Sequence, residues 1–154
     1  MKLGRESAYG IEGLLALAKR PPGTTMLLSD IAAARRVPQS FLAKIFQKLT
    51  RHGVVRSFRG SVRGYALARR PKEIKVKDIL LAIEGPDLFE RCIFWSDRCA
   101  HTNPCPLHDR WKQLKQQVIE GLIERTTLAD LMKKTPTGFA MVKRPFVQGI
   151  GRRS

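Results

Sequence analysis

The chain has 154 residues, of which 43% are hydrophobic and 27% charged, so its length suits one domain with an appendage and its composition excludes a wholly disordered protein. It carries 29 Lys and Arg against 13 Asp and Glu, a net charge of +16. Residues 1–75 hold 16 basic and 4 acidic residues, a net +12, whereas residues 76–154 hold 13 and 9, a net +4. This asymmetry indicates a polyanionic partner for the first half.

The sequence predicts a cytoplasmic protein. It has no run of about 18 uncharged apolar residues that would span a membrane. The first residues, Met-Lys-Leu-Gly-Arg-Glu, lack the apolar segment and cleavage site of a signal peptide. The three cysteines lie within 14 residues, and this odd, crowded set is a poor disulfide framework. In a reducing compartment it indicates metal binding or thiol chemistry.

Three helices are predicted in the first third of the chain. The first runs over about residues 7–20, where apolar residues recur at helical spacing before a Pro-Pro-Gly stop. Ser29 is predicted to N-cap a short second helix that ends at Arg36. The third helix follows at once, over about residues 38–51, and Gly53 is predicted at its C′ position.

The third helix has two different faces. One stripe is apolar and is predicted to pack inward: Phe41, Leu42, Ile45, Phe46 and Leu49. The rest of its surface is mostly hydrogen-bonding or cationic and carries no acid, whereas an ordinary solvated helix mixes both signs of charge.

A basic hairpin follows the third helix. Residues 54–58 read as a strand, residues 59–64 as a glycine-punctuated basic turn, and residues 65–67 as the return strand. Helix, short helix, tight turn, amphipathic helix and hairpin are the order of a winged helix-turn-helix. We therefore predict a mainly α fold with a small β-hairpin wing, completed by a long dimerisation helix.

In a helix-turn-helix the second helix enters the major groove of DNA, where polar side chains reach base edges. Here that helix is the one over residues 38–51. Ser40, Lys44 and Gln47 are expected at or near base edges. Lys48 and Arg51 are expected at phosphates, which fix the register of the protein but not the sequence it reads.

The wing supplies two further candidates, Arg59 and Arg63, which flank a small flexible turn. A slim arginine there suits a narrow minor groove, whose negative potential attracts it. Together with the acid-free helix face, these residues indicate double-stranded DNA as the partner. Non-specific RNA binding is less favoured, because Phe41 and Phe46 lie on the core stripe and offer no stacking platform. No C-x-x-C, G-x-S-x-G, P-loop or H-E-x-x-H motif occurs, so no enzyme is predicted.

The second half is predicted to hold a short helix near residues 79–83, a loop, and a long helix from Pro106 to about Arg125. Apolar residues recur along the long helix at the spacing of a dimer contact: Trp111, Leu114, Val118 and Leu122. Thr127 and Asp130 resemble a capping box before a last helix. The predicted units are a winged helix-turn-helix (1–84), a cysteine loop (85–106), a dimerisation helix with a short C-terminal helix (107–134) and a flexible basic tail (135–154).

The cysteine loop has the composition of a metal site. Six residues separate Cys92 from Cys99, five separate Cys99 from Cys105, and His108 lies three beyond Cys105. Thiolates select soft metals, including zinc and iron–sulfur clusters, and the lack of C-x-x-C argues mildly against zinc. A cluster usually takes four protein ligands, so a fourth must come from elsewhere. His108 lies one helical turn past Cys105 and is the favoured fourth ligand, whereas His101, the other candidate, lies in a loop without a fixed geometry. The alternative that all three cysteines are buried and inert fits this polar segment poorly.

Taken together, these motifs resemble a known family. The N-terminal Met-Lys-Leu, the helix sequence FLAKIFQKL at 41–49, the wing sequence RGSVRGY at 59–65 and the three-cysteine loop look like the winged-helix regulators typified by IscR and NsrR. The resemblance covers about residues 1–134. It implies a homodimeric repressor that binds palindromic operators and senses iron–sulfur status, nitric oxide or redox state through a labile cluster.

The resemblance also assigns residues. The three cysteines match the cluster cysteines, and His108 matches the histidine that completes a 2Fe–2S site in IscR-like members. Arg59 matches the wing arginine, and Ser40 and Lys44 lie on the matching recognition helix. The His108 match slightly favours 2Fe–2S over 4Fe–4S.

Two departures from the family pattern keep alternatives open. The first gap between cysteines is six residues where five is commoner. NsrR-like members use an N-terminal Asp from the partner subunit, and Ala8 stands in that place, with Glu6 and Glu12 nearby as substitutes. The alternative function is a winged-helix regulator without a cluster, controlled by a cysteine thiol switch or a partner protein.

Overall fold

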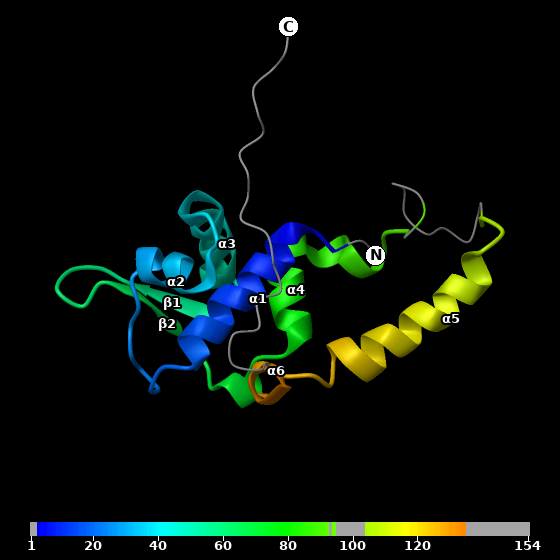
Figure 1. Cartoon of the computed structure of the whole chain (residues 1–154). Coiled ribbons are helices and arrows are strands. Elements are labelled where there is room, and N and C mark those ends of the chain that lie inside the picture. The colour runs from blue at the N-terminus through cyan, green and yellow to red at the C-terminus, as the bar shows by residue number, and fades with distance from the viewer. Residues whose placement is uncertain (1–2, 93, 95–103, 135–154) are drawn as a thin grey trace, which may run out of the picture.

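The computed structural model describes residues 3–92, 94 and 104–134. Its elements follow the predicted order, as Figure 1 shows. They are α1 (Arg5–Ala18), α2 (Leu28–Arg35), α3 (Gln39–Arg51), β1 (Val55–Phe58), β2 (Gly64–Leu67), η1 (Pro71–Glu73), α4 (Val76–Glu84), η2 (Pro86–Phe89), α5 (His108–Val118), η3 (Ile119–Ile123) and α6 (Leu128–Lys134). The mainly α fold with a two-stranded wing is confirmed.

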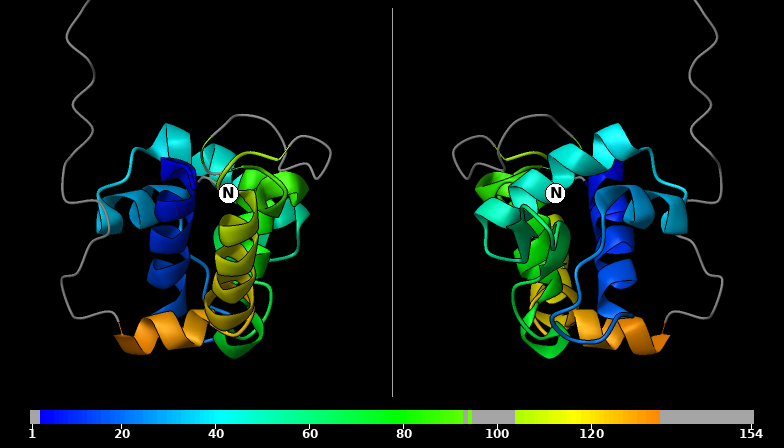
Figure 2. Two further views of the ribbon diagram at one scale, coloured as in Figure 1. Left: turned by 90° about the vertical axis from the view of Figure 1, so that its right-hand side faces the viewer. Right: turned by 90° about the vertical axis from the view of Figure 1, so that its left-hand side faces the viewer.

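Helix α1 is the centre of the core, with α2, α3, α4 and α6 packed around it. Each of these helices contributes a fully buried side chain: Leu14, Ile31, Leu42, Ile79 and Leu128. Figure 2 shows α6 crossing beneath one end of α1. The Leu128 N–H donates to the Ile74 carbonyl at 2.8 Å, which ties α6 to the chain just before α4. The last helix, which the sequence groups with the dimerisation helix, therefore packs in the core of the first half.

A close approach of α1 to α3 depends on Gly13. A β-carbon at this position would lie 2.7 Å from Cε2 of Phe46 and 3.0 Å from its Cζ, closer than atoms in contact normally come. The Phe46 ring is fully buried and rests edge-on against Tyr65, so it has little room to retreat. A residue without a side chain is therefore required where the two helices meet.

The substitution Gly13→Ala tests this packing. We expect it to lower the free energy of unfolding by about 1–3 kcal/mol, because an extra methyl in a filled core forces its neighbours out of place. The control is Gly121→Ala, since a β-carbon at Gly121 meets nothing within 4 Å. Urea denaturation of the two variants measures the difference, and equal stability would show that the α1–α3 contact is loose.

Two local predictions in the helix-turn-helix are wrong. Helix α2 begins at Leu28 with Leu27 as its N-cap and no side-chain cap, so Ser29 does not cap it. The cause is the backbone pairing of Met26 with Tyr65, at 2.8 and 2.9 Å, which keeps the chain extended up to that point. Phe41 is 39% exposed instead of packing inward, because it lies at the border of the stripe, where its ring contacts Tyr9.

The predicted end of α3 and the wing are confirmed. Gly53 has φ +68° directly after the C-cap of α3, the left-handed conformation expected of a C′ glycine. Strands β1 and β2 pair antiparallel, with Val55 opposite Leu67 and Phe58 opposite Gly64. Residues 59–63 therefore form the tip of the wing.

The long helix of the second half is not α-helical over its whole length. Helix α5 is regular only to Val118, and a π-helical turn follows, in which the Glu124 N–H donates to the Ile119 carbonyl at 2.9 Å. The wide turn brings Ile123 onto Leu80 of α4 in a second small core. The predicted long helix is therefore confirmed to about Ile123, and the π-helical turn is a local change that the sequence pattern does not indicate.

The capping box before α6 is confirmed. The Thr127 N–H donates to Asp130 at 2.9 Å, and the Asp130 N–H donates to the Thr127 hydroxyl at 3.2 Å. The hydrogen bonds from Thr127 hold the pKa of Asp130 below its ordinary value. The predicted basic tail, residues 135–154, lies outside the described residues.

Candidate functional site

The predicted recognition helix α3 is anchored by one side and exposed on the other. Leu42, Ile45, Phe46 and Leu49 are fully buried and fix the helix to the core. The exposed positions include four of the predicted DNA-binding residues: Ser40, Lys44, Gln47 and Arg51. A helix held in this way projects polar and cationic side chains away from the core in fixed positions, as binding in a major groove requires.

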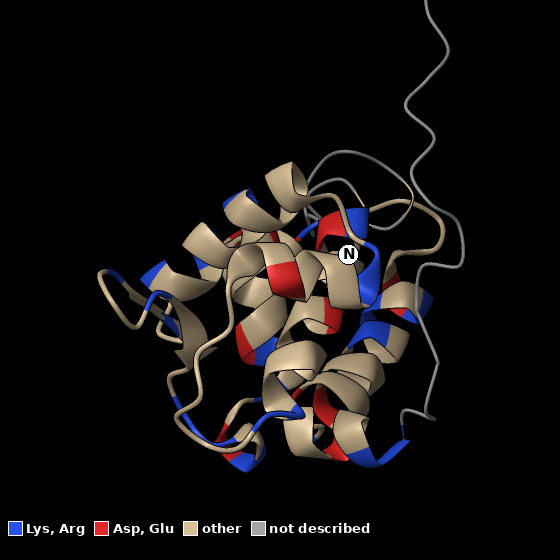
Figure 3. Cartoon of the chain, turned by 60° about the vertical axis from the view of Figure 1, so that its left-hand side comes forward, with Lys and Arg blue, Asp and Glu red and all other residues tan. Residues whose placement is uncertain are grey.

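The wing extends the same basic surface. Arg59 and Arg63 are exposed, and Gly60 between them has φ +91°. Residues 31–68 contain eight Lys and Arg and no Asp or Glu. Figure 3 shows basic residues on the hairpin and on the helices beside it, and neither the hairpin nor α3 contains an Asp or Glu. The unbroken run of positive charge suits the phosphates of a duplex.

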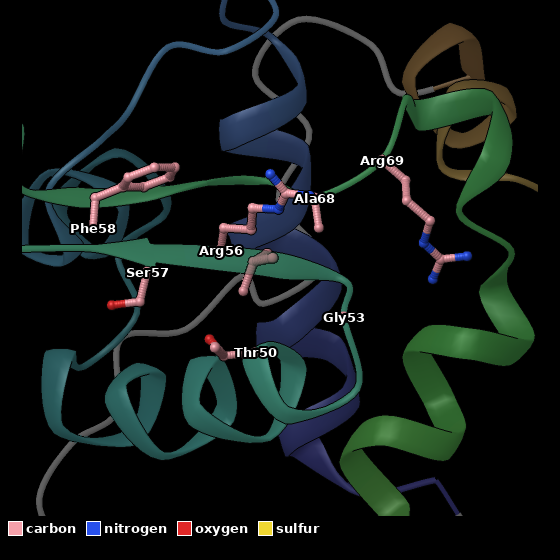
Figure 4. A pocket seen from close by; sticks show the side chains of 8 residues that line it. Thr50, Gly53, Arg56, Ser57, Phe58, Ala68 and Arg69 are labelled. Atoms are coloured by element: carbon pink, nitrogen blue, oxygen red, sulfur yellow. The ribbon is translucent and has the colours of Figure 1, made fainter.

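A shallow cavity of about 470 Å³ lies where the wing meets the end of α3. Figure 4 shows Thr50 on α3 and Ser57 on β1 at two sides of it, with Arg56 also on β1. Arg69 extends toward α4 instead, where it pairs with Asp78 at 3.4 Å. Arg56 is thus an exposed cation of this surface that the sequence patterns did not single out, although its place in a run without Asp or Glu was the available signal.

The turn before α3 holds another exposed cation that sequence reasoning missed. Arg36 is the C-cap of α2 and has φ +54°, in the left-handed region that non-glycine residues rarely adopt. Its side chain is exposed next to the start of α3. A Gly at position 36 would have indicated this left-handed turn in the sequence, whereas an Arg gives no such indication.

Lys48 differs from the other predicted DNA-binding residues because its ammonium group has partners inside the protein. Its Nζ lies 2.7 Å from a Glu6 carboxylate oxygen in α1. The same group donates to the Ile83 carbonyl at the end of α4, at 3.1 Å. The predicted phosphate contact of Lys48 competes with both interactions.

The two acids offered as cluster ligands from a partner subunit are also engaged. Glu12 is 1% exposed and pairs with Arg35 of α2 at 3.2 Å. A buried carboxylate with a cationic partner is costly to withdraw, so Glu12 is badly placed to reach another subunit. Glu6 pairs with Lys48, although its side chain is still 44% exposed. Ala8 is half-buried on the same helix.

The described part of the cysteine segment brings two predicted ligands together. His108 begins α5 and is 5% exposed, and its N–H donates to the Cys105 carbonyl at 2.9 Å. Cys105 is half-buried and Cys92 is buried. Cys99 and His101 lie outside the described residues. Within the described ranges, no three His, Cys, Asp or Glu side chains gather as a metal site.

The basic helix, the wing and the turn that joins α2 to α3 define a winged-helix DNA-binding protein. A family model described as an iron-dependent transcriptional regulator, Rrf2, matches residues 3–134. The chain therefore belongs to the Rrf2 family of transcription regulators, whose members bind DNA and are typically dimeric.

Relatives and solved structures agree with this assignment. A protein of Aquifex aeolicus (strain VF5), named as an HTH-type transcriptional regulator, is 34% identical over 107 residues, 68% of this chain and 74% of the relative. The structure of T. potens IscR has a TM-score of 0.68 and 28% identity, covering 86% of this chain and 87% of that one. CymR, the global cysteine regulator of B. subtilis, shares the fold, with a TM-score of 0.73 and 24% identity over 88% and 99% of the chains.

These relatives are named as regulators and not as enzymes, as the sequence predicts. In the part of the chain that the structure describes, no helix has the length and apolarity of a bilayer span.

The wing is tested by Arg59→Ala. We expect it to weaken binding to an operator duplex, selected from a randomised pool by the wild-type protein, by about 1–3 kcal/mol, because a groove contact is lost. Lys72→Ala is the control, since Lys72 is an exposed cation of η1 on the side of the molecule away from α3. Fluorescence anisotropy measures both affinities. Equal affinities of Arg59→Ala and wild type would remove the wing from the interface.

Proposed function

We propose that this Rrf2 regulator is a cytoplasmic homodimeric repressor that binds a palindromic operator. Its signal is iron–sulfur status, redox state or nitric oxide, sensed through a labile iron–sulfur cluster. Cys92, Cys99, Cys105 and His108 are the proposed cluster ligands, with 2Fe–2S favoured over 4Fe–4S. The proposal deepens the family's DNA-binding role by assigning a signal to the second half of the chain.

The observation that carries the cluster proposal is the burial of His108 beside Cys105. A histidine at the start of a helix in a polar segment is ordinarily a surface residue, but here the imidazole is withdrawn from water. Its backbone hydrogen bond to Cys105 keeps the two residues one turn apart. An imidazole nitrogen and a cysteine sulfur are a donor pair that iron accepts.

The chain's own residues have distinct tasks in such a site. The buried Cys92 lies just after η2 and fixes one end of the ligand segment near α4. Cys105 and His108 fix the other end at the start of α5. When bound, the cluster supplies a group that oxidants or nitric oxide destroy. The two ends of the ligand segment are therefore joined in the cluster-bound protein and separate in the cluster-free protein.

The dimer proposal rests on the apolar stripe of α5 and η3, where Val118 packs on the second core but Leu114 and Leu122 stay exposed. Leu114 is 55% exposed and Leu122 is 59% exposed, while Trp111 and Val118 on the same stripe are half-buried. Figure 1 shows α5 standing away from the helices of the core. Apolar residues at this spacing are stabilised by an identical helix from a second copy, and a two-fold dimer matches a palindromic operator.

The cluster is tested by the colour of the protein. Protein purified without oxygen should be coloured and contain iron and sulfide, and Cys→Ala at position 92, 99 or 105 should abolish the colour. His108→Ala should shift the absorption spectrum, whereas His52→Ala should not, because His52 is exposed at the end of α3.

A colourless, iron-free anaerobic preparation would contradict the cluster. If iron-free protein instead released the operator on treatment with an oxidant, the thiol-switch alternative would replace it. Absorbance with iron and sulfide analysis separates the two cases before any DNA is added.

The dimer stripe is tested by Leu114→Asp. We expect a monomer that no longer binds a duplex with two half-sites, because a buried carboxylate is unfavourable in an apolar helix contact. Gln113→Asp makes the same change of charge at an exposed position off the stripe and should remain a dimer. Sedimentation equilibrium gives the oligomeric state, and a Leu114→Asp dimer would place the contact elsewhere.

A further inference from the structure

Three helices meet at the amino group of Lys48. The residue lies in the last turns of α3, pairs with Glu6 of α1 at 2.7 Å and donates to the Ile83 carbonyl of α4 at 3.1 Å. The last carbonyls of a helix have no partner within it, and a cationic side chain there is also favoured by the helix dipole. Lys48 therefore satisfies a group of α4 that the helix itself leaves open.

Lys44 provides the contrast within the same helix. It lies one turn before Lys48 and is exposed, with no ion pair to any residue in the described ranges. An ammonium group has three donors, and two of those of Lys48 are already directed at α1 and α4. For a phosphate contact, Lys48 would have to give up both partners, whereas Lys44 gives up none.

The same end of α4 carries the segment that leads to Cys92. Glu84, next to Ile83, accepts hydrogen bonds from the Gly4 N–H at 2.8 Å and the Ser7 hydroxyl at 2.5 Å, so it is held to the start of α1. After Gly85 the chain forms η2, whose fully buried Leu88 packs on Leu80 of α4. Cys92 follows shortly. A short segment fixed at both ends thus joins the cysteine to the site of the Lys48 contact.

We propose that Lys48 is a positioning residue, which links the recognition helix to the cysteine segment through the end of α4 and does not contact DNA. This inference rests on the proposed sensing role of the cysteine segment. A change in the ligation of Cys92 displaces η2 against α4, and the hydrogen bond from Lys48 to Ile83 passes that displacement to α3. The two ligation states must differ in the position of this segment for the coupling to exist.

The test compares Lys48→Met with Lys44→Met, since methionine keeps most of the apolar stem and removes the charge. The first measurement is the salt dependence of binding of iron-free protein to a random-sequence duplex. Loss of a phosphate contact lowers the slope of log affinity against log salt by about one. We expect that decrease for Lys44→Met and an unchanged slope for Lys48→Met. A slope lowered by about one in Lys48→Met would overturn the proposal.

The second measurement needs no DNA. Amide hydrogen exchange at the end of α3 should differ between cluster-loaded and iron-free wild-type protein. Lys48→Met should abolish that difference, and Lys44→Met should keep it. Lys48→Gln also removes the ammonium group that donates to the Ile83 carbonyl, and it serves as the second variant if Lys48→Met does not fold. A difference that persists in Lys48→Met shows that the coupling takes another route.

The failure of the sensing proposal would look different. Wild-type protein that binds no cluster shows no difference between states, which overturns the coupling together with the proposed signal. The salt slope of iron-free protein then still decides whether Lys48 contacts DNA, because it requires neither iron nor a particular operator.

Discussion

The close contact of α1 with α3 is the constraint on which the DNA-binding surface depends. Gly13 allows the helices to approach until the ring of Phe46 fills the space between them. The buried ion pair of Glu12 with Arg35 fixes α2 to the same helix. Removing Glu12 or Arg35 would leave an uncompensated charge in the interior. The pair therefore also fixes the position of α2 relative to α1. The turn from α2 to α3, and the height of α3 above the core, follow from these contacts.

Most of this arrangement is predictable from local patterns. Apolar spacing at 3.6 residues, a Pro-Pro-Gly stop, and glycines at a helix end and in a hairpin are short-range signals, and each is confirmed in α1, α3 or the wing. The capping box of Thr127 and Asp130 is confirmed for the same reason, since both partners lie within one turn. Among the candidate site residues, the exposed cations of α3 and the wing needed only the charge pattern.

The features that escaped prediction depend on residues distant in sequence. Ser29 fails as an N-cap because the pairing of Met26 with Tyr65 decides where α2 begins. A pattern in α3 cannot reveal that Lys48 reaches α1 and α4, since those partners are 42 and 35 residues away. Nor does composition show that the long helix becomes π-helical at Ile119, where Ile123 packs on Leu80 of α4. Tertiary contacts override local preference at each of these places.

Helix α4 connects the two cores of the molecule. Its residues Ile79 and Ile83 belong to the main core around α1, while Leu80 packs with Leu88 and Ile123 in the second core. A short helix with two buried faces moves as a unit, because the interior is close-packed and neither face can slip alone. The chain enters the cysteine segment from η2, which packs on α4, and leaves it at the start of α5, whose continuation reaches the second core only at Val118 and Ile123. In the proposed coupling, a displacement of η2 acts on α4 first and reaches the recognition helix through the contacts of α4 with α3.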